Sequence, residues 1–428
     1  MVRDITINLN NFFLSVSDAI DLSSPAISTH QIRVAYLSWR LAKLAGLEAQ
    51  KVRHIYIAAL FHDIGALNPR DKLRLHRSEE RELTPHCVRG ERLFKSIPYL
   101  VPMAPLVRYH HRPWKTWQEA GKNLDDPYVL ESQILNLADF VERSIDRNRY
   151  ILDQSSHITG KVLALSGKEI HRDVVDLFMS LAKQEACWLD IVSPRLYSIL
   201  LNYGPLEHIQ ISLDEVAQLA TFFSKIIDFR SKYTSTHSSG VVACATILSH
   251  ICGLTEQEIL LMKIAASLHD LGKLVVPNSI LEKPGKLTRE EFNIVKQHTY
   301  HTYMILSSIH GFETIAEWAA FHHEKLDGSG YPFGLTAERL TLGARIMAVA
   351  DIFTALIERR PYRDSMPDEK VKEIFTNQVK KGQLDGKIVK ALFDHFDEIK
   401  QRVTTHQEIA QNTFLDYLTK PNSFKIAA

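Results

Sequence analysis

Histidine and aspartate recur along this chain at spacings that suit metal ligation. Among 428 residues there are 20 histidines, and they include two His-His pairs and two His-Asp pairs. Imidazole mixed with carboxylate suits Fe, Mn, Zn, Co or Ni and argues against Ca or Mg, which prefer oxygen shells. In the second half, the candidate ligands are His237, His269, Asp270, His298, His322, His323 and Asp351.

The same set occurs a second time in the first half of the chain. The first His and the His-Asp pair are related by an offset of 207 residues, and the later landmarks by an offset of 212. Several landmarks in order at matching spacings indicate an internal duplication. The counterparts are His30, His62, Asp63, His86, His110, His111 and Asp139.

Five histidines and two aspartates exceed the four ligands that close a structural zinc site. Two metals are therefore expected, and we expect Asp270 to bridge them. Two cations about 3.5–4 Å apart activate a water near neutral pH and clamp the attacking and leaving oxygens of a phosphoryl transfer. The ligand set thus predicts hydrolysis of a phosphate ester.

Composition limits the protein classes that fit. Hydrophobic residues make up 45% and charged residues 24%, which is typical of a globular protein. A formal net charge of +1 gives no basic field for a nucleic-acid polymer. The four cysteines form no C-x-x-C pair, and no signal region or long apolar run occurs, so we expect a cytoplasmic protein without membrane attachment.

The segments that carry these residues are predicted to be helices. Capping boxes begin at Ser212, Thr255 and Thr288, and strand-like alternation is nearly absent. We expect an all-α fold of two tandem helical bundles, with a short loop or hairpin near Asp327. A junction near Pro205 predicts an N-terminal domain of residues 1–205 and a C-terminal domain of residues 206–428.

The second half resembles the HD-GYP proteins, a subgroup of the HD superfamily of metal-dependent phosphohydrolases. The resemblance rests on the segments IIDFRSKYTSTHS, SLHDLGKL, VKQH, HHEKLDGSGYPFGL, LGARIMAVADIFTAL and RRPYR. It implies a compact helical bundle that hydrolyses cyclic di-GMP to the linear dinucleotide and onward to GMP. Some members act on cyclic GMP-AMP instead.

The resemblance also assigns roles to residues. One metal would be held by His237, His269, Asp270 and Asp351, and the other by Asp270, His298, His322 and His323. Members with a third metal use a Glu four residues before the first His, where this chain has Tyr233, so two divalent transition metals are expected. A metal-activated hydroxide would then attack phosphorus in line.

Basic and aromatic residues near the ligands are expected to bind substrate. Lys273 follows the His-Asp pair by about one helical turn, so it can reach a phosphate at the metals and serve as a catalytic residue together with Asp270. Arg360 and Arg363 supply guanidinium groups that bind phosphate bidentately. Tyr331 belongs to the GYP segment, which the family associates with diguanylate cyclase (GGDEF) partners.

The first half keeps every candidate ligand but loses these substrate residues. Ala66 stands in place of Lys273, while Asn148 and Ile151 stand in place of the two arginines. We expect a plain HD domain with a second metal site, serving as a regulatory or structural lobe. A second hydrolase for another phosphate substrate, or a site without metal, are the alternatives.

Two other functions stay open for the whole chain. Other HD proteins act on mononucleotides, so a nucleotidase or phosphatase is the enzymatic alternative. A non-catalytic sensor that docks on a GGDEF partner is the alternative of another class. The choice between cyclic di-GMP and cyclic GMP-AMP, and between a monomer and a homodimer, is open as well.

Overall fold

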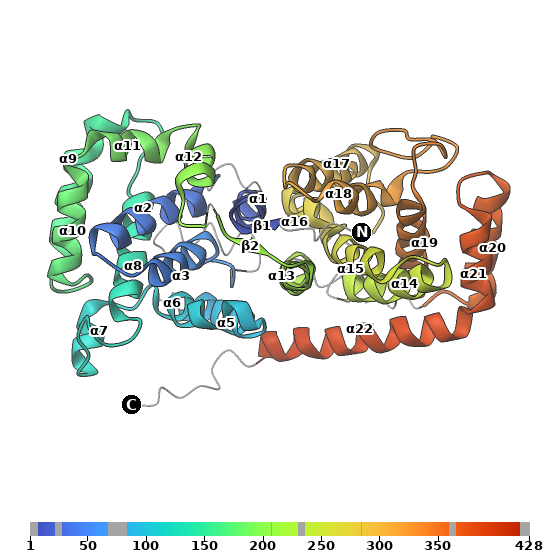
Figure 1. Cartoon of the computed structure of the whole chain (residues 1–428), viewed down its shortest axis with the longest axis horizontal. Coiled ribbons are helices and arrows are strands. Elements are labelled where there is room, and N and C mark those ends of the chain that lie inside the picture. The colour runs from blue at the N-terminus through green and yellow to red at the C-terminus, as the bar shows by residue number, and fades with distance from the viewer. Residues whose placement is uncertain are drawn as a thin grey trace. The chain divides into compact units, whose positions relative to one another are not determined.

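The computed structural model describes residues 7–21, 28–66, 84–206, 208–229, 236–283, 285–358 and 365–419. The predicted substrate residues Arg360 and Arg363 lie outside this part of the chain, as does Tyr233. Within it, nearly all regular structure is helical (Figure 1). The two strands found there, β1 (Ile7–Asn8) and β2 (Gln210–Ile211), pair with each other. The expected all-α class is confirmed.

The chain divides into two compact units, Asn8–Ile209 and Gln210–Thr419, which we call the N-terminal and C-terminal units. The N-terminal unit contains α1 (Leu9–Asp21), α2 (His30–Leu44), α3 (Ala49–Leu60), α5 (Thr84–Lys95), the 3-10 helix η2 (Pro98–Met103), α6 (Ala104–Tyr109), α7 (Trp114–Glu119), α8 (Val129–Arg143), α9 (Ile151–Leu165), α10 (Arg172–Ala182), α11 (Glu185–Val192) and α12 (Leu196–Tyr203). The C-terminal unit contains α13 (Leu213–Phe229), α14 (His237–Ile251), α15 (Glu256–Leu268), η3 (Leu271–Val275), α16 (Asn278–Leu281), α17 (Arg289–Ser307), α18 (Glu313–Ala320), η4 (Phe321–His323), α19 (Leu342–Ile357), α20 (Asp368–Lys380), α21 (Gly386–Asp394) and α22 (Phe396–Thr419).

The duplication is visible in the helices that carry the candidate ligands. Helices α2 and α14 both begin at the first His of their set, and both have 15 residues. In the N-terminal unit α2 packs against α3 and α8, and in the C-terminal unit α14 packs against α15 and α19. Each unit therefore brings the first His, the His-Asp pair and the last Asp together through the same three helices.

The predicted capping boxes begin three helices of the C-terminal unit. Thr255 and Thr288 each accept a hydrogen bond from the backbone of a Glu three residues later, and that Glu accepts one in return. Ser212 and Glu215 make the same reciprocal pair before α13. These bonds satisfy amide groups that a helix N-terminus leaves without partners, so they fix where α13, α15 and α17 begin.

Aromatic side chains fill the interior of both units. Phe12, Tyr36 and Phe61 are fully buried in the N-terminal unit, and Phe223 and Phe353 in the C-terminal unit. Burying one such side chain stabilises a fold by about 1.5–3 kcal/mol relative to leaving it exposed.

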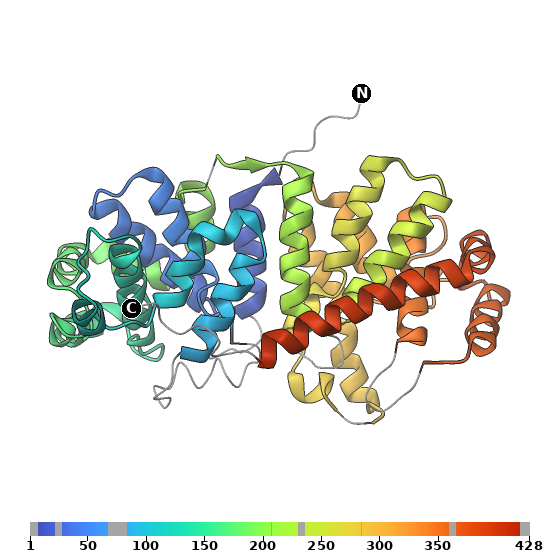
Figure 2. The same ribbon diagram turned by 90° about the horizontal axis from the view of Figure 1, so that it is seen from below.

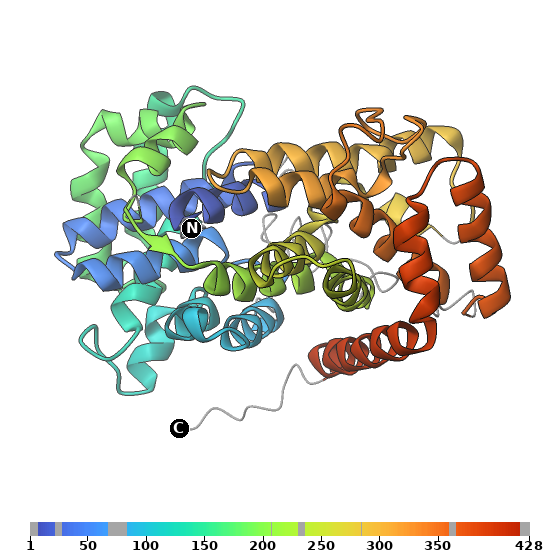
Figure 3. The ribbon, with the colours of Figure 1, turned by 45° about the vertical axis from the view of Figure 1, so that its right-hand side comes forward.

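The last helix, α22, packs along α14, the helix that begins at His237 (Figure 2). Gly240 of α14 faces both α19 and α22, because a Cβ atom there would lie 2.6 Å from the Thr354 side chain of α19 and 3.0 Å from the Gln407 side chain of α22. Beside it, α20 and α21 pack as a helical pair (Figure 3). No helix in the described ranges combines the length and apolar character that crossing a membrane would need.

Candidate metal centres

All seven candidate ligands of the C-terminal unit lie together. They form overlapping groups whose nitrogen and oxygen atoms are within 4.8 Å of one another. Most are buried, and the His323 side chain is the most open at 31% exposure. The groups are His237, His269 and Asp351; His269, Asp270 and His322; and His298, His322 and His323.

Backbone carbonyl groups fix how three of these imidazoles present their nitrogens. The Nδ1 atoms of His269, His298 and His322 lie 2.8, 2.7 and 2.6 Å from the carbonyl oxygen three residues earlier. A carbonyl only accepts, so each Nδ1 carries the proton and donates it. The lone pair is then on Nε2, which is the tautomer that binds a metal.

The Nε2 atoms of these imidazoles point toward one another, as the ligands of one metal ion do. His298 Nε2 and His322 Nε2 are 3.4 Å apart. With both Nδ1 atoms protonated, neither neutral ring can donate its Nε2 to the other, and a cation between them would satisfy both lone pairs. Nitrogens about 2.0–2.1 Å from a tetrahedral metal are spaced by about that distance. In addition, His269 Nε2 is buried without a hydrogen-bond partner. The donor set fits a transition metal.

Asp270 faces both histidine groups through different oxygens. Its Oδ2 lies 3.3 Å from His269 Nε2, and its Oδ1 lies 3.5 Å from His298 Nε2. Asp351 sits on the His237 side, with its Oδ1 3.0 Å from His237 Nε2. The Asp270 carboxylate thus has one oxygen beside each histidine group.

Gly272 lets the helix that carries His298 approach the His-Asp segment. A Cβ atom at Gly272 would lie 1.9 Å from the carbonyl oxygen of His298, which no side chain tolerates. The Gly272 amide donates to Thr302 Oγ1 over 2.9 Å, and that hydroxyl donates to the His269 carbonyl over 3.0 Å. Gly65 is the N-terminal equivalent, with a Cβ clash of 2.0 Å against the His86 carbonyl oxygen.

The charges of the buried groups suit cation binding. Burial would raise the pKa of Asp270, but the neighbouring His269 and Lys273 outweigh it and hold that pKa well below its usual value. Burial lowers the pKa of His298 to about 3 and that of His322 well below its usual value. The aspartate is therefore anionic and these imidazoles are neutral at pH 7, the forms that coordinate metals.

Lys273 lies at the cluster, as the sequence predicts. Its Nζ donates to Asp270 Oδ2 over 2.5 Å, and the side chain is 20% exposed. Burial would lower the pKa of Lys273, but Asp270 outweighs it and raises that pKa. The ammonium is thus charged beside the carboxylate that faces both histidine groups.

A glutamate that the sequence analysis does not single out lies beside the first His of each unit, hydrogen-bonded to His30 in the N-terminal unit and at ion-pair distance from His237 in the C-terminal unit. Glu142 Oε2 lies 2.5 Å from His30 Nδ1, and Glu358 Oε2 lies 3.6 Å from His237 Nδ1. Thr236 Oγ1 donates to Glu358 Oε1 over 2.7 Å. A carboxylate behind a ligating imidazole orients the ring and increases its basicity. Glu142 follows its unit's last Asp by three residues and Glu358 by seven, so matching spacings could not reveal them.

The GYP segment lies against the open side of the cluster. The Tyr331 and His323 ring centroids are 4.9 Å apart. Glu324 is buried and accepts hydrogen bonds from the Phe333 and Leu335 amides at 2.7 and 3.0 Å, which ties the loop down. A Cβ atom at Gly330 would lie 2.4 Å from Glu324 Cα, so the first residue of the motif must be glycine. The expected short loop carries one antiparallel bridge, Asp327 to Thr336.

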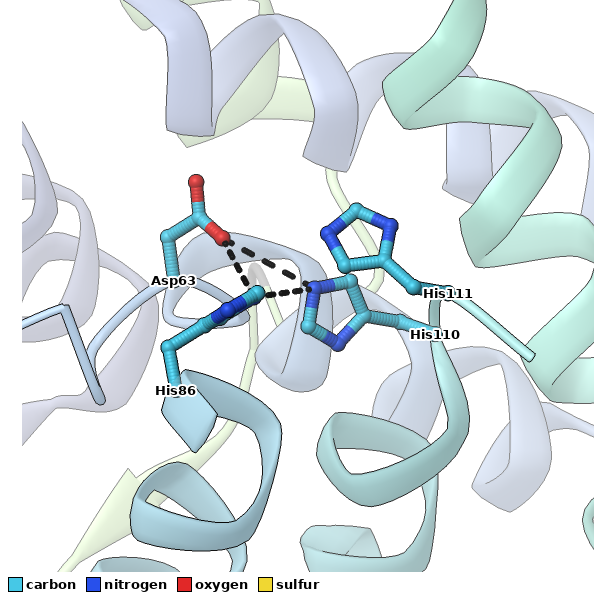
Figure 4. Close-up of side chains that lie close together, drawn as sticks. All are labelled: Asp63, His86, His110 and His111. Carbon is cyan, nitrogen blue, oxygen red and sulfur yellow. Dashed lines mark hydrogen bonds and ion pairs between the residues drawn. The ribbon is translucent and has the colours of Figure 1, made fainter. Parts of the chain in front are cut away.

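The N-terminal unit assembles the same kind of cluster. His86 Nε2 lies 3.2 Å from His110 Nε2 and 3.4 Å from Asp63 Oδ1 (Figure 4). Asp63 Oδ2 lies 3.6 Å from His62 Nε2, so this aspartate also faces two groups. His111 Nε2 is buried and has no hydrogen-bond partner. These groups are Asp63, His86, His110 and His111; and His30, His62 and Asp63. Asp139 Oδ1 lies 3.6 Å from His30 Nε2.

Besides the seven pairs of candidate ligands, one further pair of residues, Asp21 and Asp228, is related by the offset of 207 residues. Asp228 Oδ1 accepts from Ser238 Oγ over 2.7 Å, and Asp21 Oδ2 accepts from the Gln31 amide over 2.8 Å. Both acids lie 207 residues apart, and each anchors the residue that follows the first His. Burial raises the pKa of Asp228 to about 7. The offset alone could have revealed this pair.

Comparison with known families agrees with these two clusters. A family model described as an HD domain matches residues 221–388, and a second HD-domain model matches residues 27–144. The chain therefore belongs to the HD-domain proteins and carries two such domains. The expected HD-GYP relationship is confirmed.

Individual relatives match along much of the chain. A 3'3'-cGAMP-specific phosphodiesterase 1 of Vibrio cholerae is 29% identical over 389 residues, covering 89% of this chain and 90% of the relative. The 3'3'-cGAMP-specific phosphodiesterase 3 of the same organism is 34% identical, covering 66% of this chain and 61% of the relative. The cyclic di-GMP phosphodiesterase response regulator RpfG of Xanthomonas campestris is 42% identical, covering 33% of this chain and 38% of the relative.

A solved structure has the same fold over most of the chain. The crystal structure of a cyclic GMP-AMP-specific phosphodiesterase of V. cholerae matches with a TM-score of 0.63, covering 92% of this chain and 98% of that one. At 22% identity this likeness concerns the fold. It agrees with two helical units in tandem.

Proposed function

We propose that the C-terminal unit is a metal-dependent phosphodiesterase that hydrolyses a cyclic dinucleotide, either cyclic di-GMP or 3'3'-cyclic GMP-AMP. The observation that carries the proposal is Asp270, whose two oxygens face two histidine groups while its carboxylate accepts from Lys273. Relatives named for hydrolysis of these two substrates support it.

We propose two metal sites that share Asp270. His237, His269 and Asp351 would hold one divalent transition metal, and His298, His322 and His323 the other. When bound, such a pair supplies an activated water and clamps the attacking and leaving oxygens of a phosphodiester. Buried imidazole and carboxylate donors in this mixture suit Fe, Mn, Ni, Co or Zn.

The chain's own residues would position the substrate. Lys273 offers an ammonium donor beside Asp270, where it can offset charge that develops on the phosphoryl oxygens. Tyr331 offers an aromatic face next to His323, the most open candidate ligand. Arg360 and Arg363 stay proposed phosphate-binding residues on the strength of the motif they belong to.

The domain assignment stays a proposal too. We assign the activity to residues 206–428 and a regulatory or structural role to residues 1–205. Contact between the GYP loop and a GGDEF partner, and a homodimer, are further predictions.

Turnover of a substrate panel tests the activity. The purified chain is incubated with Mn²⁺ or Fe²⁺ and, separately, cyclic di-GMP, cyclic GMP-AMP and nucleoside monophosphates, and the products are resolved by chromatography. We expect linear dinucleotide from a cyclic substrate. Turnover of monophosphates alone would favour the nucleotidase alternative, and binding of a cyclic dinucleotide without turnover would favour a sensor.

A further inference from the structure

The N-terminal unit has a groove that shares no residue with its candidate metal cluster. It lies among α2, α8 and α10, and its volume is about 790 Å³. Four leucines form its apolar part, and Leu44, at the end of α2, is 45% exposed. The other three are half-buried: Leu124, Leu130 and Leu177. Exposed apolar surface that is rimmed by polar residues marks interaction sites.

The rim of this groove is acidic. Asp125, Asp173 and Asp176 line it, and none of the described residues that line it is Lys or Arg. Within the described part of the chain, the carboxylates of Asp125 and Asp176 form no ion pair. His171 Nδ1 accepts from the Asp173 amide over 3.1 Å, so this nitrogen carries no proton and His171 adds no positive charge. The negative charge of the rim is therefore not balanced from within the groove.

Local contacts hold the groove in its open form. Asn123 Oδ1 accepts from the amides of Asp125 and Asp126 at 2.8 and 3.2 Å, which fixes the loop before α8. Leu124 of the same loop packs against a buried cluster that includes Trp117. The opposite wall is α10, whose first turn is capped by His171. A preformed groove loses little conformational entropy when a partner binds.

The equivalent helix of the C-terminal unit carries the opposite charge. Helices α10 and α21 correspond at an offset of 214 residues, because each follows a cap that accepts from the amide two residues later and the first three buried positions match. At this offset Lys387 and Lys390 stand in the places of Asp173 and Asp176. The acidic face of α10 is thus a property of the N-terminal unit and not of the duplicated fold.

We propose that this groove is the docking site for an amphipathic helix of a partner protein, one that presents Lys or Arg residues beside an apolar stripe. The leucines receive the apolar stripe, as in other complexes in which a helix binds in a groove. The three aspartates face the basic residues, and complementary charge of this kind speeds association and disfavours wrong partners. The proposal does not depend on the activity proposed for the C-terminal unit.

A designed peptide tests the proposal with the full-length chain. The probe is a helical peptide with Leu at helical spacing and Lys at the flanking positions, and a second peptide has Glu in place of Lys. Fluorescence anisotropy measures binding. We expect the Lys peptide to bind and the Glu peptide not to bind. Asp173→Asn with Asp176→Asn should weaken binding by about 2- to 30-fold, the range for losing two exposed ion pairs. Leu44→Ser should weaken it too.

Asp153→Asn with Glu185→Gln is the matched control, because it removes the same charge from exposed positions of the same unit outside the groove. It should leave the affinity unchanged, and amide hydrogen exchange should show that the Lys peptide protects α10. The proposal is overturned if the Lys peptide does not bind, if either groove variant binds it as wild type does, if the control loses as much affinity, or if protection falls on α21 instead. Equal binding of the Glu peptide, or displacement of the Lys peptide by an equal concentration of spermidine, would overturn it as well.

Discussion

Lys273 donates a hydrogen bond to Asp270 over 2.5 Å, and Asp270 is the carboxylate whose oxygens face both histidine groups of the C-terminal unit. In the proposed mechanism, this ammonium offsets charge on the phosphoryl oxygens of the substrate. That role needs a charged lysine, and the adjacent carboxylate raises the pKa of Lys273. Lys273 is therefore already protonated before substrate binds.

Replacing this lysine should reduce the rate more than the binding of metal. Lys273→Met removes one preorganised donor, and losses of this kind lower kcat by about 100- to 1000-fold. Metal content should stay at the wild-type level, because the lysine nitrogen is not a candidate ligand. Steady-state kinetics with metal analysis of the same sample measures both quantities. Lys263→Met, an exposed change on α15, is the matched control, and equal rates for the two variants would remove Lys273 from the mechanism.

Glu358 should control metal affinity through His237. Glu358→Gln keeps the size of the side chain but removes the negative charge 3.6 Å from His237 Nδ1. Changes to residues behind a metal ligand typically cost about 10- to 100-fold in metal affinity or activity. A competitive chelator titration measures this loss. Glu338→Gln, on an exposed stretch after the GYP segment, should have no effect, and unchanged affinity in Glu358→Gln would contradict the orienting role.

Gly272 should tolerate no side chain. In Gly272→Ala the new Cβ would lie 1.9 Å from the His298 carbonyl oxygen, which forces α17 away from the His-Asp segment. We expect a loss of stability of about 1–3 kcal/mol, as overpacking costs, together with weaker metal binding. Thermal unfolding and metal content report both effects.

The same substitution at Gly160 should raise stability instead of lowering it. Gly160 lies inside α9, and nothing is within 4 Å of its Cβ position. Alanine is favoured over glycine in a helix interior by about 0.5–1 kcal/mol, so this variant should be slightly more stable. If both variants changed the melting temperature alike, the close approach at Gly272 would not be a constraint.

Metal removal should lower stability as well as activity. The buried carboxylates of Asp270 and Asp351 lose their counter-charge when a chelator strips the site, because these groups are anionic in the folded chain. At a free metal concentration about 100 times its Kd, a single bound ion contributes about 2.7 kcal/mol to stability. Melting curves before chelation, after it and after Mn²⁺ is restored should show a fall and a recovery. An unchanged curve would mean that the cluster does not hold metal in the folded protein.

The ligand clusters could be predicted from the sequence because the duplication repeats both residue type and spacing. Where the spacing is kept, as for His298 and His86, the helices α17 and α5 bring the residue to the same place in both units. Capping boxes such as Thr255 with Glu258 were accessible too, because their hydrogen bonds are local.

Residues that serve the same role from different positions in the two units could not be predicted from the sequence. Glu142 and Glu358 contact the first His from places four residues out of register. Their roles depend on how a helix end is oriented in space, which spacing along the chain does not record.

Asp270 provides the most direct test of the central claim that the C-terminal cluster is the hydrolytic site. Wild type, Asp270→Ala and the exposed control Asp214→Ala are incubated with Mn²⁺ or Fe²⁺ and each cyclic dinucleotide, and linear product and bound metal are measured in the same samples. The account predicts turnover by wild type and by Asp214→Ala, and loss of both turnover and C-terminal metal in a folded Asp270→Ala chain. Turnover that survives in Asp270→Ala, or absence of any linear product from metal-loaded wild type, would contradict it.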